Sequence, residues 1–218
     1  MTPKFPLLSA LLATTLLAPA VQAQDAAAGQ KKAAMCIGCH GIPGYQASFP
    51  EVHKVPMISG QGAPYIVAAL TAYKKGERKH PSMRAIAGSL NDQDMADLAA
   101  FYEKSAQSSV KAVSDKPAPQ PSAEVAALLA KGACVSCHGP DLNKPINGAY
   151  PKLAGQHADY LYVALKAYTT EGNPNVGRAN AIMSGQAKQF NHAELKALAQ
   201  YIATLPSDLR TVPQSRFK

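Results

Sequence analysis

The clearest hydrophobic pattern along the chain occurs twice, in segments 100 residues apart. In each segment apolar residues recur at spacings of three, four and seven, the period of one buried helix face. An Asn precedes each stripe, with an acidic residue three positions later, which is a typical helix start. The pattern therefore predicts a capped amphipathic helix late in each half. Its residues are Asn91, Asp94, Met95, Leu98, Ala99 and Tyr102, repeated as Asn191, Glu194, Leu195, Leu198, Ala199 and Ile202.

Two more helices are predicted in each half. One leads into a Cys pair, over Ala26 to Met35 in the first half and Ala123 to Ala133 in the second, where Ser122 is placed to cap. The other carries aromatic and aliphatic residues at helical spacing, around residues 65–73 and 160–168. No segment alternates apolar and polar residues as a half-buried strand would. The predicted fold class is all-α, with a few helices in each half.

The two halves align with each other over nearly their whole length. Gln61 aligns with Gln156, and Met83 aligns with Met183, with small insertions between the shared elements. Such self-similarity predicts a duplicated domain. Between the copies lies a segment with alternating prolines, which predicts an extended linker. The expected domains are therefore residues 24–107 and 122–218, joined by a linker at 108–121.

The N-terminus has the pattern of a secretory signal peptide over residues 1–23. Lys4 precedes an apolar stretch from Leu7 to Leu17, and small residues stand at the end of Val21-Gln22-Ala23. The apolar stretch is shorter than the roughly 20 residues that span a bilayer. Cleavage and export to the periplasm are expected, with an uncleaved anchor as the alternative.

The net charge is moderately basic, at +8. No basic run is longer than the Lys74-Lys75 pair, and the charge is spread along the chain. A nucleic-acid patch is therefore not expected, whereas an acidic protein partner remains compatible with the charge.

The four cysteines form two identical motifs, Cys36-Ile37-Gly38-Cys39-His40 and Cys134-Val135-Ser136-Cys137-His138. The C-x-x-C-H pattern is the attachment site of c-type haem. Its two thiols stand one helical turn apart and can each form a thioether with one porphyrin, and the His that follows can ligate the iron. The motifs predict two covalently bound haem c groups. A thioredoxin-like pair, a zinc site and ordinary disulfides are the alternatives.

Each haem iron needs a second axial ligand from elsewhere in its half. The candidates are His53, Met57, His80, Met83, Met95, His157, Met183 and His192. Only Met83 and Met183 match each other across the repeat, and both are expected in a loop before the last helix. Met95 is better explained as core, and His192 is expected to be exposed. The predicted axial pairs are His40 with Met83 and His138 with Met183. Each ligating His also needs a carbonyl partner, for which Pro43, Pro56 and Pro151 stay open.

Two C-x-x-C-H motifs, two later Met ligands, a repeated Gly-Gln box and a Pro-rich linker together resemble a known family. The chain is similar to the cytochrome c4 family, a tandem pair of class I cytochrome c domains. The resemblance is strongest at Tyr150-Pro151-Lys152-Leu153-Ala154-Gly155-Gln156. It implies an electron carrier of the respiratory chain, soluble or loosely attached to a membrane. Its donor would be a quinol-cytochrome c reductase and its acceptor a terminal haem-copper oxidase.

Other functions remain open. Two c-haems also occur in the electron-transfer subunits of periplasmic dehydrogenases and in dihaem peroxidases. A catalytic haem needs an exchangeable iron position, whereas each half here offers a Met, so an electron carrier is expected rather than an enzyme. The paired domains are expected to dock about a pseudo-twofold axis, with two independent beads as the alternative.

Overall fold

The computed structural model describes residues 23–107 and 117–213. The expected signal peptide, apart from its last residue, and residues 108–116 of the expected linker lie outside the described residues. Residues 117–121 have no regular secondary structure, and the Tyr201 hydroxyl donates to the Pro119 carbonyl at 3.2 Å. This end of the linker therefore lies against the second half.

The described part of the chain is built from helices, as predicted, with four two-residue strands. The first half contains α1 (Ala26–Lys32), α2 (Ala34–His40), β1 (Gln46–Ala47), β2 (His53–Lys54), α3 (Ala63–Lys75), β3 (Arg78–Lys79), α4 (Pro81–Gly88) and α5 (Asp92–Ser105). The second half contains α6 (Ala123–Lys131), α7 (Cys134–His138), α8 (Ala158–Thr169), β4 (Gly177–Arg178), α9 (Ala181–Ala187) and α10 (His192–Ala203).

The predicted late helices are confirmed as α5 and α10, including their starts. The side chains of Asn91 and Asn191 each accept a hydrogen bond from the backbone N–H three residues on, and the carboxylates of Asp94 and Glu194 each accept one from the Asn backbone N–H. Each capping box satisfies two backbone donors that a helix start leaves unpaired. Met95 is 1% exposed, as expected of a core residue.

Two sequence expectations were wrong in detail. The helix expected over Ala26 to Met35 is two helices, α1 and α2, which are separated at Ala33. Met83 and Met183 lie in the short helices α4 and α9 rather than in a loop. These helices begin at local caps, where His80 Nδ1 accepts from Met83 N and Asn180 Oδ1 accepts from Met183 N. A helix of two turns is too short to show a hydrophobic period.

Each half has its own hydrophobic core. In the first half α1 and α3 pack on α5, and the core includes Ile37, Ile66 and Leu98. In the second half α8 and α6 pack on α10, around Leu161 and Ile202. Helices α2 and α7, which carry the Cys motifs, hold equivalent positions in the two halves.

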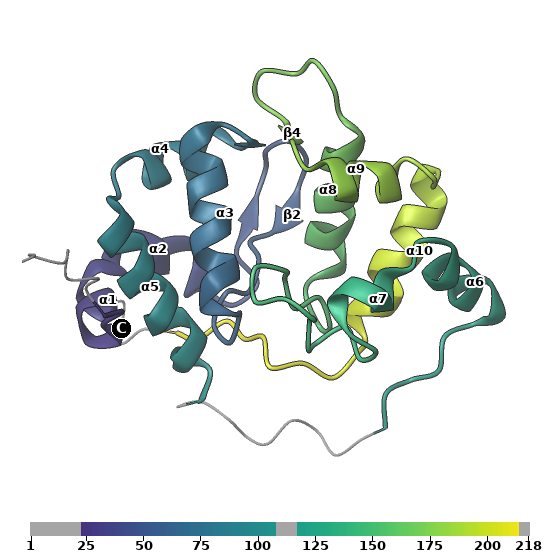
Figure 1. Ribbon diagram of the computed structural model, residues 1–218, viewed down its shortest axis with the longest axis horizontal. Coiled ribbons are helices and arrows are strands. Elements are labelled where there is room, and N and C mark those ends of the chain that lie inside the picture. The colour runs from purple at the N-terminus through teal and green to yellow at the C-terminus, as the bar shows by residue number, and fades with distance from the viewer. Residues whose placement is uncertain (1–22, 108–116, 214–218) are drawn as a thin grey trace, which may run out of the picture.

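The two halves dock with α3 and α8 facing each other and the short strands between them (Figure 1). Strands β3 and β4 pair antiparallel across the boundary, with Arg78 opposite Arg178. After α10 the chain runs back along the first half (Figure 1), where Arg210 N donates to Ser59 O at 2.9 Å. The backbone passes so close that a Cβ at Gly60 would lie 2.3 Å from the Asp208 carbonyl oxygen. The docked arrangement, rather than independent beads, is therefore the one observed.

Candidate haem sites

The two Cys motifs lie on helices, at equivalent places in the two halves. Cys36 and Cys39 stand on α2, and Cys134 and Cys137 stand on α7, so each pair is separated by about one helical turn. None of these four cysteines forms a disulfide. Burial raises the pKa of the Cys36 and Cys134 side chains. Each motif ends with its His as the last helical residue.

The structure shows which proline carbonyl accepts a hydrogen bond from each motif His. The His40 Nδ1 lies 2.8 Å from the Pro56 carbonyl oxygen, and the His138 Nδ1 lies 3.0 Å from the Pro151 carbonyl oxygen. Pro56 and Pro151 are equivalent in the repeat, whereas Pro43 takes no such part. Because Nδ1 donates to the carbonyl, Nε2 is left as the atom that can bind a metal.

Burial also sets the protonation state of these rings. It lowers the pKa of both His40 and His138 below the ordinary value, although the proline carbonyls oppose the shift. Both imidazoles are therefore neutral at pH 7, which is the form that ligates iron. The site chemistry fits a haem on this count.

The remaining candidate ligands are sorted by their contacts. Met83 and Met183 are both half-buried and occupy the third position of their helices. His80 caps α4 and lies edge-on to Phe49. His53 is buried at the boundary between the halves, with its ring tilted over Tyr160. His192 is exposed, as expected. The pairing of each Met with an iron stays a prediction.

A cluster of arginines and tyrosines at the boundary, with Arg78 buried and the other members half-buried, was not anticipated from the sequence. Arg78 donates to the hydroxyls of Tyr65 and Tyr160, at 3.2 and 3.3 Å, and Arg178 donates to Tyr160 at 3.1 Å. The guanidinium groups also lie over rings, with Arg78 4.7 Å from the centroid of Tyr73. The signal that could have found the cluster is the repeat itself, because Arg78 and Arg178 are 100 positions apart, as are the two Met residues.

The cluster holds positive charge without a neutralising partner among the described residues. The Nε of Arg78 is buried and has no hydrogen-bond acceptor. Burial alone would raise the pKa of Tyr160, but the charges of Arg178 and Arg78 lower it to about 8. Buried guanidinium groups need anionic or polar partners. The carboxylates of a haem are groups of the kind that this cluster lacks, so the residues present fit the cofactor.

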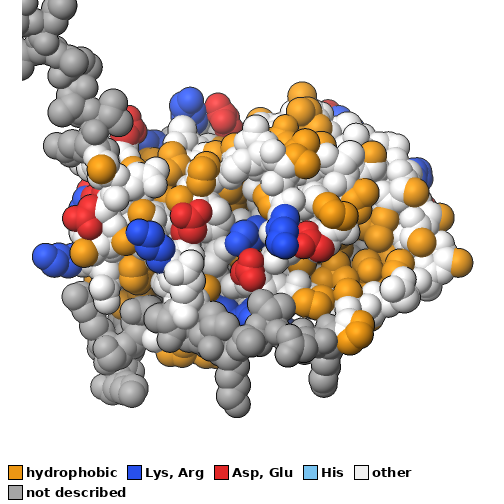
Figure 2. All heavy atoms as spheres, turned by 60° about the horizontal axis from the view of Figure 1, so that its bottom comes forward, with side chains coloured by type: hydrophobic (Ala, Val, Ile, Leu, Met, Phe, Trp, Pro, Cys, Tyr) orange, Lys and Arg blue, Asp and Glu red, His pale blue; other side chains and the backbone are white. Residues whose placement is uncertain are grey.

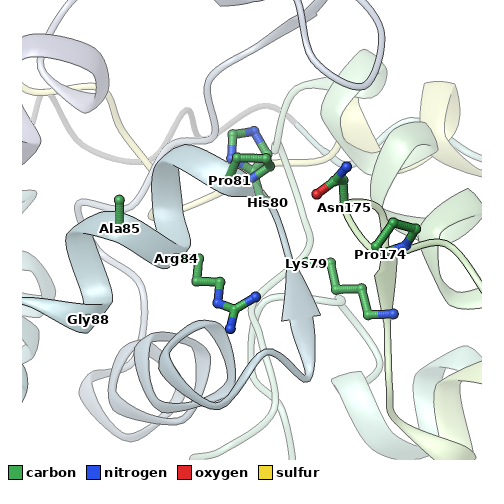
Figure 3. A pocket seen from close by; sticks show the side chains of 8 residues that line it. All are labelled: Lys79, His80, Pro81, Arg84, Ala85, Gly88, Pro174 and Asn175. Carbon is green, nitrogen blue, oxygen red and sulfur yellow. The ribbon is translucent and has the colours of Figure 1, made fainter.

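A separate hollow of about 470 Å³ lies where α4 meets the second half. Lys79 and Arg84 extend into it from β3 and α4, with Pro174 and Asn175 on the opposite side (Figure 3). It contains no residue of either Cys motif, and Lys79 already donates to the Asn173 carbonyl at 2.6 Å. The hollow is thus a basic groove beside the domain boundary rather than a haem site.

The surface of the second half has an apolar region. Hydrophobic side chains gather over that end of the face in Figure 2, whereas charged side chains of both signs lie over the middle. Exposed apolar residues near the second Cys motif are Val135, 44% exposed, and Ile146, 71% exposed. None of the helices in residues 23–107 and 117–213 is long and apolar enough to cross a membrane.

Comparison with known proteins gives a consistent result. The family model described as Cytochrome c matches residues 26–105 and 122–206. Cytochrome c4 of Pseudomonas aeruginosa is 32% identical over 201 residues, which is 91% of this chain and 98% of the relative. The crystal structure of reduced recombinant cytochrome c4 from Pseudomonas stutzeri superimposes with a TM-score of 0.61 at 29% identity. The match covers 84% of this chain and 100% of that one.

One further relative has a more specific description. A protein of Stutzerimonas stutzeri described as a thiosulfate dehydrogenase electron acceptor is 31% identical over 211 residues. The match covers 89% of this chain and 92% of the relative. The two segments matched by the family model each include one Cys motif.

Proposed function

Because the chain belongs to the cytochrome c family, as a two-domain member of the cytochrome c4 group, we propose that it carries single electrons between redox proteins of the periplasm. The observation that carries the proposal is the repeated bond from the motif His to a proline carbonyl, at His40 and again at His138. A ligating His is oriented in this way. Residues 24–107 and 122–218 are the proposed domains, and residues 1–23 the proposed signal peptide.

As a two-domain cytochrome c, the protein binds two covalent haem c groups. Cys36 and Cys39 are proposed to hold the first haem, and Cys134 and Cys137 the second. His40 and Met83 are the proposed axial ligands of the first iron, and His138 and Met183 those of the second. When bound, each haem supplies a one-electron couple whose potential depends on its axial ligands and surroundings.

Residues around each haem site affect how the protein uses this one-electron couple. Pro56 and Pro151 keep each proximal imidazole in one orientation, so that little reorganisation accompanies oxidation. The Arg78 and Arg178 cluster places positive charge at the boundary between the halves, where it favours carboxylates and added electrons. Nothing in this arrangement provides an open ligand position for a substrate if both Met residues ligate. An electron carrier therefore explains the site better than a peroxidase-like enzyme.

The proposed partners are a quinol-cytochrome c reductase as donor and a terminal haem-copper oxidase as acceptor. The relative described as a thiosulfate dehydrogenase electron acceptor favours a second candidate, in which a thiosulfate dehydrogenase is the donor. Rates of reduction by each purified donor, measured by stopped flow, separate the two. The faster donor at equal concentration identifies the physiological class.

The haem content and ligation are tested together on the purified exported protein. A pyridine haemochrome assay should find two haem c groups per chain, and an optical redox titration should show two one-electron steps. A weak absorption band near the red edge of the visible spectrum is expected for ferric iron bound by Met. Fewer than two haems per chain would contradict the proposal.

A further inference from the structure

Two glutamines make reciprocal contacts across the boundary between the halves. Gln61 Nε2 donates to the Lys152 carbonyl at 3.0 Å, and Gln61 Oε1 accepts from Lys152 N at 2.9 Å. Gln156 makes the same pair of bonds to Met57, at 2.8 and 3.0 Å. Both glutamines are 4% exposed. Each side chain therefore binds one backbone residue of the opposite half and does so out of contact with water.

The amide orientation of each glutamine is determined by its contacts. The Oε1 of Gln61 also accepts from Gly62 N at 3.0 Å, and the Oε1 of Gln156 accepts from His157 N at 3.0 Å. In each case two backbone N–H groups point at the oxygen and one carbonyl faces the nitrogen. If the side-chain amide were turned by 180°, its NH2 group would face the two backbone N–H donors and its oxygen would face the carbonyl. Only one orientation of each amide therefore satisfies these hydrogen bonds.

The residues that the glutamines bind follow directly after the two prolines that orient the histidines. The peptide between Pro151 and Lys152 accepts from His138 on its carbonyl side and donates to Gln61 on its N–H side. The peptide between Pro56 and Met57 joins His40 to Gln156 in the same way. Each peptide is thus a bridge between the motif His of one half and the glutamine of the other.

We propose that Gln61 and Gln156 are positioning residues that adjust the reduction potential of the haem in the opposite domain. The proposal rests on the proposed function in one respect, since it takes His40 and His138 as iron ligands. It goes beyond that function by assigning a role to the glutamines and a direction to their effect.

The physical basis is polarisation along a chain of hydrogen bonds. An acceptor on the N–H side of a peptide makes its carbonyl a stronger acceptor, by about 10–30% per bond. A stronger bond from the His Nδ1–H to that carbonyl makes the imidazole more basic, and a more basic ligand favours ferric iron. Gln61 therefore lowers the potential of the second haem, and Gln156 lowers that of the first.

The test is a pair of substitutions, Gln61→Met and Gln156→Met, in the full-length holoprotein. Met has a similar length but neither donates to the carbonyl nor accepts strongly from the N–H group. Gln61→Met should raise the potential of the second haem, by roughly a twofold change in its reduction equilibrium, and leave the first nearly unchanged. Gln156→Met should do the reverse. The two haems are distinguished in redox titrations followed by NMR of their assigned methyl signals.

A second readout does not depend on potentials. In the reduced protein, the Nδ1–H proton of His138 should shift upfield in Gln61→Met, because its bond to the Pro151 carbonyl is weaker. The corresponding proton of His40 should not move. Since the two substitutions report independently, a failure of one variant to fold leaves the other to decide.

Two controls separate this effect from general loosening of the interface. The first control is Asp159→Asn. Asp159 contacts Lys54 across the same boundary, with Lys54 N 3.0 Å from Asp159 Oδ2, and the substitution weakens this contact. It removes no hydrogen bond of either bridging peptide. Gln200→Met changes an exposed glutamine of α10. Neither should produce the crossed pattern of shifts.

The proposal is overturned if Gln61→Met shifts the first haem as much as the second, or shifts neither. It is also overturned if Asp159→Asn reproduces the crossed pattern, because docking alone would then set the potentials. The redox titration of the wild-type protein tests the proposed function independently of the proposal about the glutamines. Two haems with Met and His ligation there would support that function whatever the glutamine variants do.

Discussion

At the residue scale, two methionines of the first half differ in their surroundings and in the roles expected of them. Met95 and Met83 both lie in helices of the first half, yet Met95 is 1% exposed in the core whereas Met83 is half-buried near a helix start. The repeat distinguishes the two, because Met95 aligns with Leu195 and Met83 aligns with Met183. The core position of Met95 is confirmed, and the ligand role of Met83 stays a prediction. A ligand must keep its chemistry, whereas a core residue needs only its volume.

Met83→His is therefore expected to change one haem and spare the other. His in place of Met as the sixth ligand lowers the reduction potential, so one of the two titration steps should move down while the second stays. Loss of the weak red band from half of the ferric haem would accompany it. Met95→Leu is the control, and it should alter neither potential. An unchanged spectrum in Met83→Ala would instead point to His80 or His53.

A second prediction at this scale concerns Asp97, which is buried on α5. It accepts from Lys32 Nζ at 2.8 Å and from Asp25 N at 3.0 Å. The bond from Lys32 lowers the pKa of Asp97. Since the folded-state pKa lies below the unfolded value of about 3.9, the carboxylate stabilises the fold above about pH 4. That stabilisation is lost as the pH falls through the folded-state value.

Asp97→Asn should thus lower the free energy of unfolding at pH 7 by about 1–2 kcal/mol, with a smaller difference from wild type at pH 3. Guanidinium titrations at the two pH values measure it. Glu171→Gln, which removes an exposed ion pair with Lys188, serves as a comparison and should change little. An equal loss at both pH values would show that packing, not charge, explains Asp97.

Which carbonyl holds each His could not be read from the sequence. Pro43, Pro56 and Pro151 all offer an acceptor, and the choice depends on where the chain returns after the motif. The loop between residues 41 and 55 has no periodic pattern to define that path. The arginine and tyrosine cluster was not predicted for a similar reason. Tyr65 and Tyr160 fit the apolar stripe of a helix, and nothing in the sequence indicates that they contact arginines from both halves.

At the element scale, the helices that carry a long stripe and a cap were predictable, and the short elements were not. Helices α5 and α10 have both signals, so their starts were correct to the residue. Helices α4 and α9 have only two turns, and β3 and β4 have two residues each, so they depend on contacts from distant parts of the chain. Whether such short elements form is therefore decided by tertiary contacts and not by their local sequence.

The packing of α1 on α5 leads to a prediction about Gly29. A Cβ at this position would lie 2.0 Å from the Asp97 carbonyl oxygen and 2.5 Å from its carbon, and backbone atoms cannot move aside cheaply. Ala normally stabilises a helix by about 1 kcal/mol relative to Gly, but here the clash should prevail. Gly29→Ala is expected to destabilise the first domain by about 1–3 kcal/mol, measured by thermal unfolding.

Gly185→Ala in α9 is the matched control, because nothing lies within 4 Å of a Cβ there. It should be neutral or slightly stabilising, as helix propensity alone would suggest. If both substitutions behaved alike, the close approach of α1 to α5 would not limit the residue at position 29.

At the scale of the whole molecule, docking of the halves predicts electron transfer within one chain. The boundary is closed by the β3–β4 pair and by the Lys166–Glu51 ion pair at 2.6 Å, besides the glutamines. After partial reduction by a flash, the haems should equilibrate at a rate independent of protein concentration. Internal transfer no faster than exchange between molecules would contradict a coupled pair.

Exchange with partners should respond differently to salt. The net charge of +8 favours an acidic partner at long range, and exposed charges are screened over about 10 Å at 0.1 M. The bimolecular rate is expected to fall as ionic strength rises, while the internal rate stays constant. A bimolecular rate without salt dependence would favour the apolar surface around Val135 and Ile146 as the docking site.

The return of the chain from α10 to Ser59 also limits how the two halves can move. A rigid body joined at one point can turn about three axes, whereas one held at two separate points can turn only about the line between them. The backbone bond from Arg210 to Ser59 holds the halves together at one place, and the β3–β4 pair holds them at another. While both contacts persist, rotation of one half against the other is confined to the line that joins them, so a wide opening of the boundary requires one of the two contacts to break.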